Sequence, residues 1–498
     1  MGRCVEYPHF TGSREAAKIT LVNKSYYLTT TLPYVNAKPH IGFALEIVQA
    51  DVLARYHGVS LNEDVFFNTG TDENGKKIYE QALASGKDPQ AYVDEYSAEF
   101  DKLKKALNLS YNHFIRTTDA HHKAAAQEIW RRVANNGYIE KGVYKAKYCV
   151  GCELEKQDSE LVEGKCPLHP TKEIELIEEE NYFFQFKKLE KKLLTHYDLY
   201  PDFVVPAHRQ KEIRNFVEAG LTDFSISRLK EKMPWGVDVP DDPKHVMYVW
   251  FDALTNYIST LGWPEDEKSF AQYWGTIESP RGVQVAGKDN LRQQSAMWQA
   301  MLLAAGLPPT RQILIHGFIT SGGQKMSKTL GNVVDPFEYV EKYGTDALRY
   351  YLLAKMDPFE DSDFTKEKFE EAYQADLANG LGNLVARVAA MCGGTTFGKN
   401  DLPNISSTVA QRLGDYRFDE AIKDIWSRVS RADQLISERK VWEIKGVEKE
   451  TVLCKLVDAI RQIAMDLASF MPETAEKIQK QFGGEKIAKG AALFPRLS

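Results

Sequence analysis

The sequence lacks any apolar run close to the roughly 18 residues that a membrane-spanning helix needs. Residues 1–20 also lack the apolar stretch of a secretory signal, because the charged residues Glu6, Arg14 and Glu15 interrupt them. Internal repeats and low-complexity segments are missing as well. We therefore expect a soluble protein with no membrane partner, located in the cytoplasm.

An excess of positive charge is also absent, since 63 lysines and arginines stand against 70 aspartates and glutamates and the net charge is -7. This balance argues against a general basic surface that coats nucleic acid, so any RNA partner must meet local patches. Cysteine is scarce, with six residues in 498, which excludes a disulfide scaffold. Three of the six lie between Cys149 and Cys166, and this crowding suggests a metal site.

Hydrophobic periodicity predicts how the first part of the chain folds. Residues 26–31, 42–56 and 65–68 have the patterns of a strand, an amphipathic helix and a second strand. This order is typical of a parallel α/β sheet, in which ligands bind at the carboxyl ends of the strands. We expect the first site near residues 33–42.

The rest of the chain divides into further regions, and the length alone predicts about two to four domains. Short strand-like pieces between Gly137 and about Pro240 interrupt the α/β pattern and indicate an inserted domain. The α/β pattern then resumes with strands predicted at 245–250, 282–286 and 312–316. From about residue 367 the sequence predicts helices, including 372–391 and 417–439, which an antiparallel bundle would bury.

The first chemical motif is the loop 33–43, which presents His40 at the start of the predicted helix. A helix N-terminus has a partial positive charge and free N–H groups that suit phosphates, and Gly42 would let the backbone approach a nucleotide. Taken alone the motif is weak, because a histidine beside a glycine at a helix start is commonly structural.

The second motif is the glycine-flanked loop 322–332, which carries Lys325 and Lys328. Lysine is a compact charge on a mobile stem, so such a loop can close over ATP and stabilise the charge that develops as pyrophosphate leaves. The alternative interpretation, a solvated turn, would be the better one if this motif stood by itself.

A third motif indicates a metal. Cys149-x2-Cys152 and Cys166-x2-His169 form two knuckles that can supply four tetrahedral ligands to one Zn²⁺. Four protein ligands leave no open position, so this zinc would be structural. In the alternative interpretation Cys166 or His169 is incidental.

The first two motifs, in this order and each after a predicted strand, resemble the HIGH and KMSKS signatures of class I aminoacyl-tRNA synthetases, here residues 40–43 and 325–329. Further segments resemble the methionyl-tRNA synthetase family in its branch with a single zinc knuckle, and the resemblance covers residues 25–498. These segments are YVWFDALTNY (248–257), AGKDNLR (286–292), EEENYFFQF (178–186) and YGTDALRYYLL (343–353).

The resemblance implies an α/β, Rossmann-like catalytic domain with an inserted zinc-binding connective domain and a C-terminal all-α anticodon-binding bundle. The implied division is an N-terminal extension (1–24), the two catalytic halves (25–138 and 244–344), the insert (139–243), a stem-contact or linker segment (345–371) and the helical domain (372–498). No segment resembles the additional dimerisation domain of some relatives, so we expect a monomer.

The resemblance also implies the reaction of a methionine–tRNA ligase. ATP with Mg²⁺ activates L-methionine to methionyl-adenylate with release of pyrophosphate, and the methionyl group passes to the terminal adenosine of tRNA(Met). The implied ATP residues are His40, Gly42, Glu46, Gly287, Asp289, His316, Lys325 and Lys328. Those for methionine are Leu32, Tyr34, Asp72 (holding the ammonium group), Trp250, Ala253, Tyr257 and Gln294, and those for the anticodon are Asn383, Arg387 and Trp442.

The sequence departs from the family pattern at several of these positions. Phe43 replaces the second histidine of the HIGH signature, which removes a hydrogen-bonding group from the catalytic site. Asn290 and Gln294 replace a common apolar residue and a histidine, and Leu254 replaces a common proline, so methionine selectivity is less secure than the class.

Three rival interpretations follow from the same motifs. A leucine, isoleucine or valine enzyme would need a large editing insertion, for which this insert is too short. A cysteine enzyme has a catalytic zinc that touches the substrate, whereas four protein ligands would close this site. A catalytically impaired tRNA-binding paralogue is suggested by Phe43.

Overall fold

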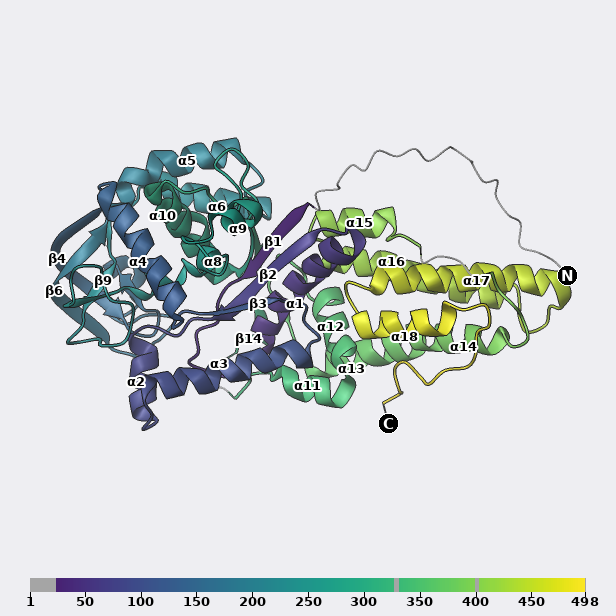
Figure 1. Cartoon of the computed structure of the whole chain (residues 1–498). Helices are drawn as coiled ribbons and strands as arrows, with labels where there is room; N and C mark the ends of the chain where they lie inside the picture. Colours follow the sequence, from purple (N-terminus) through teal and green to yellow (C-terminus); the bar gives the residue numbers. More distant parts are fainter. Residues whose placement is uncertain (1–23, 327–330, 399–402, 498) are drawn as a thin grey trace, which may run out of the picture.

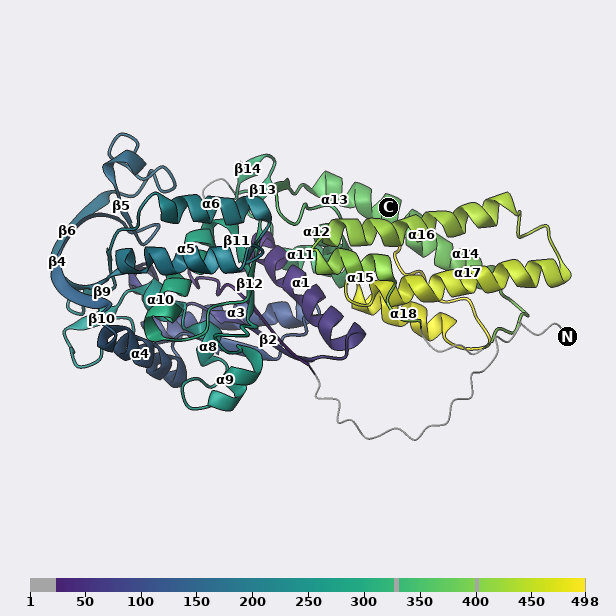
Figure 2. The same ribbon diagram turned by 90° about the horizontal axis from the view of Figure 1, so that it is seen from above.

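The computed structural model describes residues 24–326, 331–398 and 403–497. The molecule is elongated, with an α/β body carrying extra strands toward one end and a group of helices at the other (Figure 1). The same separation is visible from above, where α14, α16 and α17 extend away from the sheet (Figure 2). None of the helices in the described part of the chain combines the length and apolar character that crossing a membrane requires. The predicted α/β fold with an insertion and C-terminal helices is confirmed.

The centre of the α/β body is a six-stranded sheet in which all neighbouring strands are parallel. β1 lies inside it and pairs with β2 on one side and with β11 on the other, where Leu28 faces Val283. Segments far apart in sequence therefore end at one edge of the sheet. The spatial order is β3 (His113–Arg116), β2 (Asp64–Thr71), β1 (Ser25–Thr30), β11 (Val283–Gly287), β12 (Gln312–His316) and β7 (Val204–Val205).

Helices cover both faces of this sheet. α1 (Ile41–Arg55) contacts β1, β11 and α12, and it is buried along nearly its whole length, which explains its weak amphipathic pattern. A core on one face includes α1 and α3 and continues into the C-terminal helices, whereas a second core includes α4 and α10. The helices of the body are α2 (Lys76–Ala84), α3 (Pro89–Ala106), α4 (Ala120–Asn135), α7 (Val249–Ala253), α8 (Asn256–Ser259), α9 (Glu267–Tyr273) and α10 (Trp298–Ala305).

The inserted strands form a second, antiparallel sheet in the order β5-β4-β6-β8. β4 (Ile139–Cys149) and β6 (Ile174–Phe184) are long, and the segment between them contains β5 (Leu154–Lys156) and the cysteine motif. β8 (Phe224–Ser225) completes this sheet, and β9 (Ser227–Leu229) pairs with β10 (His245–Met247).

The predicted insert, residues 139–243, does not stand wholly apart from the parallel sheet. It also contains α5 (Glu190–Leu199), β7 and α6 (Ala207–Glu218), and β7 joins the sheet beside β12. A two-residue strand is too short to show an apolar pattern, so the sequence did not reveal it.

The predicted strand at 245–250 is shorter in the structure. β10 ends at Met247 and α7 begins at Val249. The prediction was too long because a short apolar run is compatible with either a strand or a helix. The strands predicted at 282–286 and 312–316 are confirmed as β11 and β12.

The C-terminal part is helical, as predicted, after a small sheet of β13 (Ile319–Ser321), β14 (Gln324–Lys325) and β15 (Ser362–Asp363). The helix predicted at 372–391 has a π-helical middle, Tyr373–Gly382, between α13 and α14. The helix predicted at 417–439 is confirmed as α16. The helices are α11 (Pro336–Tyr343), α12 (Thr345–Ala354), α13 (Lys366–Ala372), α14 (Asn383–Met391), α15 (Ser407–Gly414), α16 (Phe418–Glu438), α17 (Gly446–Leu467) and α18 (Pro472–Phe482).

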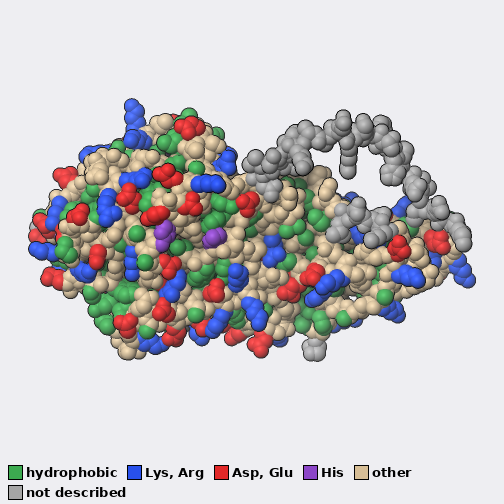
Figure 3. Space-filling view, in the orientation of Figure 1, with side chains coloured by type: hydrophobic (Ala, Val, Ile, Leu, Met, Phe, Trp, Pro, Cys, Tyr) green, Lys and Arg blue, Asp and Glu red, His purple; other side chains and the backbone are tan. Residues whose placement is uncertain are grey.

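Charge on the face of the molecule in Figure 3 is mixed. Acidic and basic side chains are interspersed over the α/β body and the helical end alike. A nucleic acid that meets this face encounters local groups of charge and not a continuous basic surface.

Candidate active site

A cavity of about 490 Å³ lies where the loops after β1, β2, β11 and β12 come together. This is the edge of a parallel sheet at which ligands bind, because the loops and helix N-termini converge there. The residues predicted for catalysis, ATP and methionine that line it are Leu32, Tyr34, His40, Gly42, Phe43, Glu46, Asp72, Trp250, Gly287, Asp289, His316 and Lys325.

His40 begins α1 and caps it with its own side chain. Its Nδ1 accepts a hydrogen bond from the Gly42 N–H at 3.1 Å. A Cβ at position 42 would lie 3.0 Å from the imidazole, so glycine lets the ring fold over the helix end. Desolvation by the surrounding cavity walls lowers the pKa of the His40 ring, against an opposing contribution from Asp289. The neutral ring therefore has its proton on Nε2, assigned from this hydrogen bond, and Nε2–H can donate.

Phe43 occupies the position where a second histidine was expected. Its ring packs edge-to-face on Phe100 of α3, with centroids 5.5 Å apart. The aromatic pair makes this part of the cavity wall apolar, so position 43 supplies packing and no hydrogen bond.

Glu46 and His316 connect α1 to the end of β12. Glu46 accepts hydrogen bonds from the Thr31 N–H at 2.8 Å and from the Thr31 hydroxyl, and its second oxygen lies 3.0 Å from His316 Nε2. The other ring nitrogen, Nδ1, lies 2.7 Å from the Gly317 carbonyl. Burial alone would lower the pKa of His316, but the hydrogen bond and charge of Glu46 outweigh it and raise the pKa.

Asp72 follows β2 and is fixed through its backbone. Its N–H donates to the Pro33 carbonyl at 3.0 Å, and its own carbonyl accepts from the Val35 N–H at 3.1 Å. Burial raises the pKa of the Asp72 carboxyl well above its usual range, and the neighbouring Glu153 carboxylate adds to the shift. The site therefore holds a carboxyl group that an incoming cation would stabilise in its charged form.

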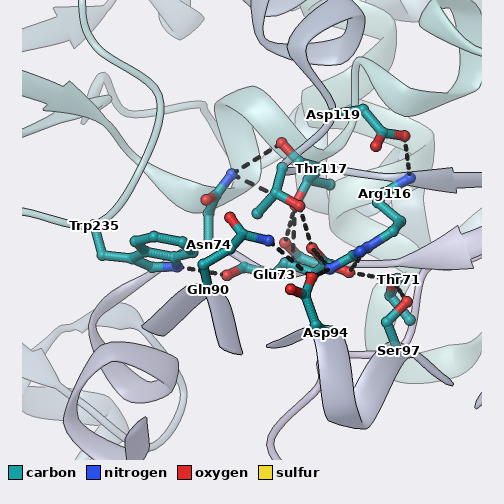
Figure 4. A network of polar contacts seen from close by, with 12 residues as sticks. Thr71, Glu73, Asn74, Gln90, Asp94, Ser97, Arg116, Thr117, Asp119 and Trp235 are labelled. Atoms are coloured by element: carbon teal, nitrogen blue, oxygen red, sulfur yellow. Dashed lines mark hydrogen bonds and ion pairs between the residues drawn. The ribbon is translucent and has the colours of Figure 1, made fainter. Parts of the chain in front are cut away.

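A network of polar contacts holds the segment around Asp72 (Figure 4). The buried Glu73 carboxylate receives both arms of the Arg116 guanidinium, at 2.7 and 3.0 Å, and the Thr71 hydroxyl at 2.7 Å. The indole N–H of Trp235 donates to the Glu73 carbonyl at 2.7 Å. A bidentate arginine fixes both distance and orientation, so the residue next to Asp72 is held rigidly.

The lysine loop begins as a hairpin between β13 and β14. Gly322 and Gly323, with φ of 62° and 73°, form its turn in a conformation that favours glycine. Lys325 lines the cavity, and its Nζ lies 5.6 Å from the centre of the Phe318 ring. Lys328 lies outside the described residues, as do residues 1–23 of the predicted N-terminal extension.

Three residues predicted for the methionine pocket are buried but are not among the described residues that line the cavity: Ala253, Tyr257 and Gln294. Gln294 donates to the Tyr257 hydroxyl at 2.6 Å and accepts from Gln284 at 3.0 Å. The structure thus brings Tyr257 and Gln294 together, in a polar cluster next to the cavity residues and not on its surface.

The lining residues that were not predicted from the sequence include Lys77 and Glu153. Lys77 stands five positions after Asp72, and Glu153 directly follows Cys152. The nearby motifs were the only available signal, since nothing in the sequence brings these two positions together.

The predicted metal ligands form a cluster. Ligand atoms of Cys149, Cys152, Cys166 and His169 all lie within 4.8 Å of one another. Cys152 Sγ is 3.2 Å from His169 Nδ1 and 3.5 Å from Cys166 Sγ. A Cβ at Gly151 would lie 2.4 Å from the His169 ring, so glycine leaves room for that ligand. Three thiols and an imidazole at this separation could hold one metal ion.

The predicted anticodon residues lie in the helical end. Asn383 and Arg387 share the first turns of α14, and Arg387 pairs with Asp433 of α16 at 2.5 Å. Trp442 follows α16, is 56% exposed and donates to Glu443 at 3.2 Å. An exposed indole of this kind is available to stack on another ring.

The parallel sheet with the N-terminus of α1 at its carboxyl edge is the fold of the class I aminoacyl-tRNA synthetases. The family model for "tRNA synthetases class I (M)" matches residues 26–174 and 170–389. The chain belongs to the methionyl-tRNA synthetase family, and its activity is that of a methionine–tRNA ligase.

The similarity extends over nearly the whole chain. The methionine–tRNA ligase of a Nostoc species is 40% identical over 93% of this chain and 92% of its own length. That of Caldanaerobacter subterraneus is 38% identical over 96% of this chain and 79% of its own length. The structure of Mycobacterium tuberculosis methionyl-tRNA synthetase with methionyl-adenylate is 33% identical and superposes with a TM-score of 0.86, covering 95% of this chain and 100% of that one.

Proposed function

We propose that the cavity binds ATP and L-methionine together, joins them as methionyl-adenylate, and then presents the adenylate to the terminal adenosine of tRNA(Met). The observation that carries this proposal is the convergence of His40, Lys325 and Asp72 on one cavity. Two groups suited to phosphate face the carboxyl group suited to an ammonium ion, so both substrates can be held in line for reaction.

The nucleotide end of the cavity is assigned to α1, β11, β12 and the lysine loop. The N-terminus of α1 and the free Nε2–H of His40 donate to phosphate oxygens, and Lys325 and Lys328 stabilise the charge on the departing pyrophosphate. Mg²⁺ bound with ATP would neutralise further phosphate charge. The remaining residues hold the adenosine and are Gly42, Glu46, Gly287, Asp289 and His316.

The amino-acid end is assigned to the loop after β1 and to Asp72. In the free protein, burial raises the pKa of the Asp72 carboxyl. The positive charge of the substrate ammonium group would stabilise the ionised carboxylate and bind to it. Leu32, Tyr34 and Trp250 form the wall around the polarisable thioether, and Tyr257, Gln294 and Ala253 support that wall from the protein interior.

The chemistry requires no covalent enzyme intermediate. The methionine carboxylate attacks the α-phosphorus of ATP, the bond to the β-phosphate oxygen breaks, and pyrophosphate leaves. A ribose hydroxyl of the tRNA then attacks the methionyl carbonyl and AMP leaves. The protein positions the reactants and neutralises charge, so the loss of one donor at Phe43 lowers the rate and does not abolish the pathway.

The other predicted features complete the proposal. The cluster of Cys149, Cys152, Cys166 and His169 in the insert 139–243 would hold one structural Zn²⁺. The anticodon is read at the helical domain 372–498 by stacking on Trp442 and by the polar groups of Asn383 and Arg387. The protein acts as a monomer in the cytoplasm.

The test is ATP–pyrophosphate exchange with each of the twenty amino acids in turn. We expect kcat/KM for exchange to be at least about 10²-fold higher with methionine than with the other aliphatic amino acids, because accurate charging of the tRNA requires that the enzyme discriminate at activation. Exchange with another amino acid would replace the methionine assignment. Binding of tRNA(Met) without exchange by any amino acid would favour the impaired paralogue that Phe43 suggests.

A further inference from the structure

Glu153 is a buried carboxylate that lies between the metal cluster and the cavity. It directly follows the cluster residue Cys152, has a left-handed φ of 51° and is 5% exposed. One of its oxygens, Oε1, accepts a hydrogen bond from the Tyr34 hydroxyl at 2.8 Å and another from the Lys77 N–H at 2.9 Å. A carboxylate on a turn is usually solvated, so its burial on these two donors needs an explanation.

The contacts of Glu153 join segments that are far apart in sequence. Tyr34 lies in the loop after β1, and Lys77 lies in the first turn of α2, next to the segment that holds Asp72. The backbone carbonyl of Glu153 also accepts from the Tyr248 hydroxyl at 2.6 Å, immediately before α7. The turn that carries two metal ligands is thereby attached to two sides of the cavity.

The space around this contact is closed by Gly75. A Cβ at that position would lie 2.4 Å from the Tyr34 hydroxyl oxygen and 2.9 Å from Glu153 Oε2. Tyr34 therefore has its hydroxyl enclosed between the glycine backbone and the carboxylate, and its ring faces the cavity. Without the carboxylate, the enclosed hydroxyl would be left without its acceptor.

We propose that Glu153 is a positioning residue that fixes the Tyr34 side chain in the amino-acid wall of the cavity and so makes methionine binding depend on the metal-cluster turn. This inference rests on the proposed assignment of Tyr34 to the methionine site. Because Oε1 receives both hydrogen bonds, the positioning of Tyr34 depends on this acceptor oxygen and not on the negative charge, which acts separately on the pKa of Asp72.

The charge and position roles can be separated by substitution. Glu153→Gln keeps an acceptor oxygen and removes the charge, whereas Glu153→Ala removes both. Tyr34→Phe removes the donor. Glu175→Ala is the matched control, because Glu175 is another carboxylate of the insert that bonds α2, at 2.6 Å through Lys76, but it does not line the cavity.

The measurements are the methionine dissociation constant from intrinsic tryptophan fluorescence, the KM values for methionine and ATP in pyrophosphate exchange, and the bound metal per chain. We expect Glu153→Ala and Tyr34→Phe each to weaken methionine binding by about tenfold, with the KM for ATP changed less than about twofold. The double variant should bind methionine no more weakly than the weaker single variant, because both single changes remove the same Tyr34–Glu153 hydrogen bond. Glu153→Gln and Glu175→Ala should stay within about threefold of the wild type, and every variant should keep its metal.

Several results would overturn the inference. Multiplying effects in the double variant would mean that Glu153 and Tyr34 act independently, and a Glu153→Gln variant as weak as Glu153→Ala would mean that charge is what matters. Loss of metal in Glu153→Ala would make Glu153 a support of the cluster alone. Absence of methionine-dependent exchange in the wild type would overturn the proposed function together with this inference, whereas an active wild type with unchanged Glu153→Ala would overturn the inference only.

Discussion

Replacing Arg349 by methionine should destabilise the protein strongly, because this side chain joins the α/β body to the C-terminal helices. Arg349 of α12 is fully buried, and its Nη1 lies 2.7 Å from Asp51 of α1. It also donates to the carbonyls of Leu107, Ser469 and Phe470, at 3.1, 3.0 and 2.8 Å. Burial alone would raise the pKa of Asp51, but the charges of Arg349 and Arg55 hold it below the usual value, so the pair is ionised.

The magnitude follows from what Arg349→Met leaves behind. Removing one partner of a buried ion pair costs about 3–5 kcal/mol, because the other charge stays buried. Arg55 remains beside Asp51 at 2.7 Å and offsets part of this cost, whereas the three carbonyls that lose a donor add to it. We therefore expect a loss of about 3–5 kcal/mol.

The assay is urea unfolding, followed in parallel by circular dichroism and tryptophan fluorescence because a chain of this size need not unfold in one step. Arg214→Met is the matched control: Arg214 pairs with Asp198 and Glu218 at the surface, where an ion pair contributes about 0–1 kcal/mol. The double variant Arg349→Met with Asp51→Asn should lose less stability than the sum of the two single variants, because both changes remove the same ion pair. Equal stability of the Arg349→Met and Arg214→Met variants would refute the reasoning.

Four further predictions concern the metal cluster, the cavity and the helical end. Cys149→Ser or Cys166→Ser should lower bound zinc and thermal stability together, because metal binding contributes to folding, and a zinc-free, fully folded wild type would contradict this. Lys325→Ala should slow single-turnover adenylate formation by about 10²-fold with methionine affinity unchanged, and an unaltered rate would exclude its role at the phosphates. Trp442→Ala should weaken tRNA charging by about 5-fold to 150-fold while exchange persists, whereas equal losses in both assays would show a structural role for this residue. His40 caps α1 as a neutral imidazole, and its pKa is lower in the folded than in the unfolded state. Its contribution to the free energy of unfolding is therefore complete above about pH 6.5, where the imidazole is neutral in both states. This contribution declines as the pH falls toward the pKa of His40 in the folded state. The Tm of the wild type, taken relative to that of His40→Asn, which caps without titrating, should therefore fall from pH 7.5 to pH 5, and a pH-independent difference would count against this.

The parts of the fold that the sequence predicted are those with long, periodic patterns or strong turn chemistry. The strand, loop and helix around His40 and the helix at 417–439 were predicted because each spans enough residues for a period to be visible. β7, with two residues, and the start of α7 at Val249 were not, because tertiary pairing and not local pattern decides short apolar segments.

The candidate site was predictable where a motif supplies several groups in sequence order. The cysteine pairs and the two signature loops are of this kind, and the structure brings their described members to one cluster and one cavity. Glu153 was missed because its partners Tyr34 and Lys77 meet it only through the packing of the insert on the sheet. The predicted pocket residues Tyr257 and Gln294 are held by a buried hydrogen-bond cluster whose extent depends on Gln284, a strand residue that no motif indicates.

The position of β1 in the sheet has a consequence for synthesis on the ribosome. β1 emerges early, but its neighbour β11 follows about 250 residues later, which is roughly 12–50 s at about 5–20 residues per second. During that interval β1, α1 and β2 can associate, yet one edge of β1 has no strand to pair with, and α1 has neither β11 nor α12 against it. An unpaired strand edge next to an uncovered apolar helix is prone to aggregation. Nascent chains that stop before residue 283 should therefore associate with chaperones, and chains that extend past residue 354, the end of α12, should be released from them.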